Sequence, residues 1–96
     1  MLRLQIKPRA ILIAKAAYDW YEEQKKGLGD LFLAELSRCY TKIEKNPQYY
    51  QQIEKEYRHL VLNKFPYVII FEIMEDEIII FAIFHTARNP KLKFNK

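Results

Sequence analysis

The side chains that could carry chemistry collect in the second half of the chain. Two histidines, His59 and His85, could move protons near neutral pH. Arg58, Lys64 and Arg88 could hold a phosphate or another anion. Proton carriers and cations together are what an attack on a phosphodiester bond requires, so a reaction or a binding contact would lie in this region.

The common enzyme signatures are absent from the sequence. Gly27 and Gly29 are the only glycines and neither precedes a Lys-Ser pair, so no phosphate-binding glycine loop exists. Cys39 is the single cysteine, and no His and Cys residues stand at ligand spacing. We therefore expect no metal site, no cofactor and no Cys-His nucleophile. Cys39 lies on an apolar helical stripe and is expected to be a core residue.

The charge balance favours an anionic partner. The 96 residues include 16 Lys and Arg against 12 Asp and Glu, a net charge of +4. No acidic residue follows Glu77, whereas Arg88, Lys91, Lys93 and Lys96 do, so the C-terminal end is electropositive. The first residues do not resemble a secretory signal, and no apolar run approaches the ~20 residues that span a bilayer. We expect a cytoplasmic protein without membrane contact.

The elements that must position these residues follow from hydrophobic periodicity. Residues 2–7 alternate between apolar and polar side chains and predict a strand with one buried face. Residues 9–26 predict a helix, which Gly27-Leu28-Gly29 should end. Asp30 is the expected cap of a second helix, which Asn46-Pro47 should end.

The remaining sequence predicts a sheet. Three strands are expected, over residues 57–62, 67–74 and 78–85. The last two are joined by a tight turn at Glu75-Asp76 and are apolar on both faces, so they should be central in the sheet. Phe71 and Phe81 are expected to be buried there. The order β-α-α-β-β-β predicts one α+β domain over residues 1–96, with a helical hairpin packed on a mostly antiparallel sheet.

Motifs around these strands resemble those of the ParE/RelE toxin superfamily. Arg58 precedes a short loop and then Phe65-Pro66-Tyr67, which opens a β-branched strand. The last strand ends in His85, followed by Arg88 and Pro90. The order of elements matches across essentially the whole chain. The resemblance implies the toxin of a bacterial type II toxin–antitoxin system.

The two branches of that superfamily differ in their cations. The resemblance places the cations of the ribosome-dependent nucleases at His59, Val61 and Val68, and only Arg88 falls where the family has a last-strand arginine. The tryptophan that often follows the Arg-x-Pro element is also missing. These departures favour the ParE branch, whose members act on DNA gyrase and do not cut RNA. The alternatives are a RelE-like endoribonuclease that cleaves messenger RNA on the ribosome and a non-toxic binding module with the same fold.

Each candidate site residue has an ordinary structural alternative. The residues expected to contact a partner or target are Arg58, Lys64, Tyr67, His85, Arg88 and Lys91; for a nuclease the catalytic candidates are Arg88, His85 and Arg58. Arg58 could instead pair with a glutamate such as Glu56, and His85 could be a structural hydrogen-bonding residue. Arg88 could be an ordinary solvated charge, and Tyr67 could simply pack.

The resemblance also implies the partners. We expect a hetero-oligomer with a cognate acidic antitoxin and, as the target, DNA gyrase; the alternative target is the ribosome with its messenger RNA. A protein that only binds its target needs no catalytic set, so the expectation leans away from an enzyme.

Overall fold

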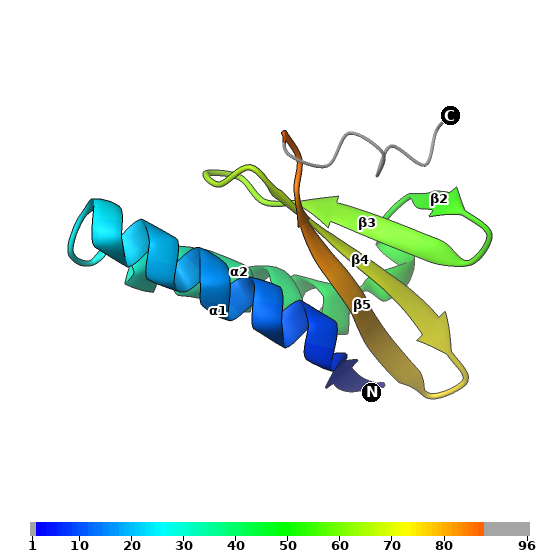
Figure 1. The fold of residues 1–96 in the computed structure, drawn as a ribbon. Helices are drawn as coiled ribbons and strands as arrows, with labels where there is room; N and C mark the ends of the chain where they lie inside the picture. Colours follow the sequence, from blue (N-terminus) through cyan, green and yellow to red (C-terminus); the bar gives the residue numbers. More distant parts are fainter. Residues whose placement is uncertain (1, 88–96) are drawn as a thin grey trace.

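A computed structural model describes residues 2–87 of the chain. Its elements are β1 (Arg3–Ile6), α1 (Pro8–Gln24), α2 (Leu28–Lys45), the 3-10 helix η1 (Pro47–Tyr49), β2 (Gln52–Glu54), β3 (Tyr57–Val61), β4 (Tyr67–Met74) and β5 (Glu77–His85) (Figure 1). The predicted helices and strands are all found. A short strand, β2, and the 3-10 turn were not predicted.

The sheet has the order β1-β5-β4-β3-β2. β1 runs parallel to β5, and all other neighbours are antiparallel. β4 and β5 are therefore inner strands, as their two-faced apolar sequences predicted. The α+β class and the mostly antiparallel sheet are confirmed.

The helical hairpin covers one face of the sheet (Figure 1). Ala10, Ala17 and Tyr21 of α1 are buried. The buried side chains of the predicted apolar stripe of α2 include Phe32, Cys39 and Ile43. They meet a row of side chains from β4 and β5 made of Tyr67, Ile69, Phe71, Ile78, Ile80 and Ile83. Cys39 is core, as expected.

The opposite face of the sheet, which we call the open face, has its own smaller apolar cluster. Val68, Ile70 and Ala82 are buried there beneath four partly buried side chains, those of Ile53, Tyr57, Phe81 and Phe84. The expectation that Phe81 is buried was wrong, whereas Phe71 is fully buried. Phe81 directly follows the core residue Ile80 in the strand, so it lies on the open face, which the helices do not cover. A β-bulge beside it pairs Ile70 with Ala82 and Phe71 with Ile80 and leaves Phe81 unpaired. Its ring lies on the open face, 4.8 Å from the guanidinium carbon of Arg9.

The turn between the helices differs from the predicted one. α2 begins at Leu28 and includes Gly29, and Asp30 lies in its first turn without capping it. The cap comes from α1, because the Glu22 carboxylate accepts the backbone N–H groups of Gly27 at 2.8 Å and Gly29 at 2.9 Å. A carboxylate at this position satisfies donors that a helix start leaves unpaired and complements the helix dipole.

The two glycines serve this turn in different ways. Gly27 has φ +90°, a left-handed conformation, and a Cβ there would meet nothing within 4 Å. A Cβ on Gly29 would lie 2.7 Å from the backbone oxygen of Tyr18, so Gly29 allows α1 and α2 to approach closely.

Replacing these glycines by alanine should separate the two effects. Gly29→Ala should lower the free energy of unfolding by about 2–3 kcal/mol, because backbone at Tyr18 cannot move aside cheaply. Gly27→Ala should cost roughly 1 kcal/mol, from the left-handed backbone alone. Urea denaturation of both variants measures the difference. Equal stability of Gly29→Ala and the wild type would contradict the close approach of the helices.

Candidate functional site

Three of the predicted site residues meet at one end of the sheet, which we call the loop end. It comprises the β3–β4 loop (residues 62–66), the start of β4 and the end of β5. Tyr67 pairs with His85 across the strands, and their rings lie 5.0 Å apart, edge to face. Lys64 is exposed at the tip of the loop. Tyr67 is buried, so its packing role is confirmed.

The loop end is held by hydrogen bonds at both strands. Leu62 N–H donates to the Tyr67 carbonyl at 2.9 Å, which closes the loop. The Pro66 carbonyl accepts the Thr86 N–H at 2.8 Å and the Thr86 hydroxyl at 3.3 Å. The Nδ1 atom of His85 accepts the Ala87 N–H at 3.2 Å. Arg88 and Lys91, two further predicted contact residues, lie outside the described residues.

Aromatic packing joins the loop end to the helices. The Phe65 ring lies 5.0 Å from Tyr21 and 5.3 Å from Phe32, edge to face in both cases. Phe32 also lies 5.3 Å from Tyr67. Such pairs add roughly 0.5–1.5 kcal/mol each beyond the burial of apolar area. The loop end is therefore built on the hydrophobic core, and Asn63, Lys64 and Pro66 of its loop are exposed to solvent.

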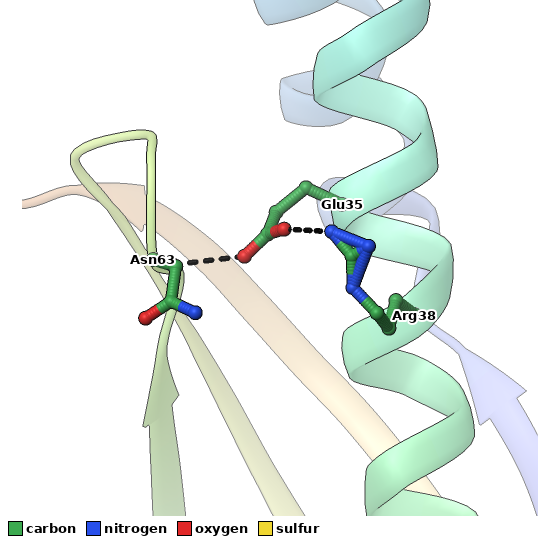
Figure 2. Close-up of polar contacts among 3 residues, drawn as sticks. All are labelled: Glu35, Arg38 and Asn63. Carbon is green, nitrogen blue, oxygen red and sulfur yellow. Dashed lines mark hydrogen bonds and ion pairs between the residues drawn. The ribbon is translucent and has the colours of Figure 1, made fainter.

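Sequence reasoning missed the residue that holds the loop tip. Glu35 of α2 is only 5% exposed, and among residues 2–87 it is the buried charged side chain. One carboxylate oxygen accepts the backbone N–H of Asn63 at 2.9 Å, and the other pairs with the Arg38 guanidinium (Figure 2). The signal available in the sequence was a carboxylate beside the apolar stripe, three residues after Phe32. It could not reveal the partner, because Asn63 lies 28 residues away.

The surroundings of Glu35 favour its charged form. The hydrogen bond from Asn63 lowers the pKa of this carboxyl below its ordinary value of 4.5, and Arg38 and Lys42 lower it further. Burial opposes them and does not reverse the direction. The ionised carboxylate is thus the form that holds the loop at neutral pH.

Arg58 lies apart from the loop end. It pairs with Phe71 in β4, and about four residues of strand, roughly 13 Å, separate Phe71 from Tyr67. Its guanidinium donates to the backbone carbonyls of Tyr50 at 2.7 Å and Gln48 at 3.4 Å. Arg58 thus bonds main-chain carbonyls and not the Glu56 carboxylate, which was the alternative expected from the sequence. These bonds join η1 and the residue after it to the sheet.

The two histidines lie on opposite faces of the sheet. His59 pairs with Ile70, which belongs to the open-face cluster, whereas His85 pairs with Tyr67, which belongs to the helix-covered core. Directly paired residues share a face, so the imidazoles cannot act as an acid–base pair on one bond. At the positions that the resemblance assigns to nuclease cations, Val61 is half-exposed and Val68 is buried.

An apolar groove of about 310 Å³ runs between the two helices. It is lined by Ile6, Ile11, Ala14, Lys15, Tyr18, Leu33, Leu36 and Tyr40. Ile11 and Leu33 are 54% and 41% exposed, which is unusual for apolar residues on facing helices. Burial raises the pKa of Tyr40 to about 12, so its hydroxyl stays neutral. The groove offers shape and apolar area with a single lining cation.

Within residues 2–87, no group of three or more His, Cys, Asp or Glu side chains could hold a metal ion. In the same part of the chain, no helix is both long and apolar enough to cross a membrane.

The Glu35 link predicts how stability depends on pH. A lowered folded-state pKa contributes stability above about pH 4.5, the ordinary value, and this contribution is lost as pH falls through the folded pKa. Glu35→Gln should therefore be less stable than the wild type at pH 7 and should lose less stability between pH 6 and about pH 3. Thermal melts across this range measure the slope. Glu23→Gln, at an exposed position of α1, is the control; a slope for Glu35→Gln like that of the wild type would contradict the link.

Comparison with known proteins agrees with this architecture. The profile of a family described as the ParE toxin of the type II toxin–antitoxin system, parDE, matches residues 4–90. No curated protein matches the chain. A solved structure of the chromosomal ParDE toxin–antitoxin system from P. aeruginosa matches with a TM-score of 0.67 and 20% identity, over 88% of this chain and 96% of that chain; at this identity the likeness shows the fold. Because the family profile covers nearly the whole chain, this protein belongs to the ParE toxin family.

Proposed function

We propose that this chain is a toxin that acts in the cytoplasm by binding DNA gyrase and that a cognate acidic antitoxin neutralises it. The observation that carries the antitoxin part of the proposal is the apolar groove between α1 and α2, a surface that suits a protein partner. The structure from P. aeruginosa is described as a chromosomal ParDE toxin–antitoxin system, and family membership supports a toxin paired with an antitoxin here.

The expected occupant of the groove is an amphipathic helix of the antitoxin. Its apolar side chains would cover Ile11 and Leu33, which are the exposed part of the lining. Acidic residues on its flanks would meet Lys15 and the net charge of +4. Apolar anchors would supply most of the affinity, and opposite charge would speed encounter.

The geometry of the basic and titratable residues supports binding over RNA cleavage. Cleavage by a 2′-hydroxyl needs a proton acceptor, a proton donor and cations around one phosphate. In the described part of the chain, the two histidines are on opposite faces and Arg58 is engaged by main-chain carbonyls. The exposed Lys64 and the residues beyond Ala87, including Arg88 and Lys91, would instead make charged contacts with gyrase.

Substitution in the groove should separate it from other exposed apolar surface. Leu33→Glu should weaken binding of the acidic protein encoded beside this chain by about 100-fold, because it places a charge against the apolar anchors. Leu12→Glu is the matched control, since Leu12 is 68% exposed on α1 and does not line the groove. Titration calorimetry measures both affinities. Equal losses, or no loss at Leu33, would remove the groove as the docking site.

The target is tested by comparing two reactions with one preparation. The purified protein should inhibit supercoiling of relaxed plasmid by gyrase and leave messenger RNA intact on translating ribosomes. Lys64→Ala should raise the concentration needed for inhibition roughly 2- to 10-fold, as loss of a charged contact does. Lys55→Ala, an exposed lysine in the β2–β3 turn, should leave inhibition unchanged. Cleavage at codons with normal supercoiling would establish the RelE-like nuclease instead.

A further inference from the structure

The loop end depends on a polar link that core packing does not require. Leu62 and Phe65 are buried on either side of the loop tip, at 4% and 8% exposure, so the core fixes where the loop begins and ends. Asn63 and Lys64 between them are exposed. The Asn63 N–H bond to Glu35 is the contact that joins this tip to α2 (Figure 2).

A buried carboxylate is a costly way to make such a contact. An apolar side chain of similar size at position 35 would pack beside Leu36 and Cys39 without the penalty of burying a charge. Glu35 keeps both of its oxygens engaged, one by the loop and one by Arg38, whose own side chain is 54% exposed. What the carboxylate provides, and an apolar residue would not, is an acceptor aimed at one backbone amide.

The same loop also sets the end of β5. Pro66 accepts two hydrogen bonds from Thr86, and the Tyr67 ring packs edge to face against His85. Displacement of the loop would therefore move Lys64, His85 and the point where the chain continues toward Arg88.

We propose that Glu35 is a positioning residue, which sets the geometry of the gyrase-binding loop end by holding the Asn63 amide. The inference rests on the proposed function for the identity of the target. The groove lies on the other flank of α2, at Leu33, Leu36 and Tyr40, so antitoxin binding does not depend on Glu35.

Two substitutions of Glu35 test this. Glu35→Met removes the acceptor and fills the space; Glu35→Gln keeps an oxygen that can accept the Asn63 N–H. Glu35→Met should speed hydrogen exchange at the Asn63 amide by roughly tenfold or more, the loss expected for a hydrogen bond to a charged acceptor. It should weaken inhibition of gyrase by a similar factor while antitoxin affinity changes less than about twofold. Glu35→Gln should keep most of the amide protection at Asn63 and most of the gyrase inhibition that Glu35→Met loses. If Glu35→Met acted only through poorer packing, the amide oxygen of Gln would not make this difference.

The possible results distinguish a failure of the positioning role from a failure of the proposed function. If Glu35→Met melts near the wild-type temperature, exchanges faster at Asn63 and still inhibits gyrase fully, the positioning role is wrong. If hydrogen exchange at the Asn63 amide is unchanged in Glu35→Met, the hydrogen bond to Glu35 does not hold the loop tip, and the positioning role is also wrong. If the wild-type protein does not inhibit gyrase at all, the proposed function fails; growth arrest by the same three proteins then decides whether Glu35 positions a different target contact.

Discussion

The β4–β5 hairpin is apolar on both faces, and a strand pair of this kind is stable only where both faces are kept from water. The two helices supply one cover. Tyr57, Phe81 and Phe84 supply the other from within the sheet, over Val68, Ile70 and Ala82. Among residues 2–87 the open face is covered by side chains of the sheet itself and by no helix, so the centre of the sheet is buried while its loop end and edges stay accessible.

Aromatic contacts join the helices and the sheet to the candidate site. Tyr21, Phe32, Phe65 and Tyr67 form one cluster that spans α1, α2, the β3–β4 loop and β4. The cluster fixes the two ends of the loop, and the Glu35 carboxylate fixes its tip. The apolar groove lies on the opposite flank of the same helix α2. One helix thus supports two surfaces that can be changed separately by substitution.

The periodicity of apolar residues correctly predicted the helices, four of the five strands and most of their buried faces. Alternation identified β1, the helical stripes placed Phe32, Cys39 and Ile43 in the core, and two-faced apolar runs placed β4 and β5 at the centre.

Sequence prediction failed where contacts between residues far apart in the chain determine the structure. The exposure of Phe81 depends on which face of the sheet the helices cover. The cap of α2 comes from Glu22 across a turn and not from the nearby Asp30. The strand β2 has only three residues, which is too short for an alternating apolar pattern, and it forms because it pairs with β3. The sequence named Lys64, Tyr67 and His85 as candidates, and the structure places these three at one end of the sheet. Arg58, named with them, lies elsewhere, and Glu35 was missed because its contact with Asn63 joins residues far apart in the sequence.

The parallel pairing of β1 with β5 joins the beginning of the chain to its end. Arg3 lies opposite Glu77, so the contact closes a loop of more than seventy residues. Such non-local pairing comes late in folding, because the entropy of bringing distant segments together must be overcome first. During synthesis β1 has no strand partner until β5 has been made. A newly made chain therefore passes through a period in which its sheet lacks the β1–β5 pairing.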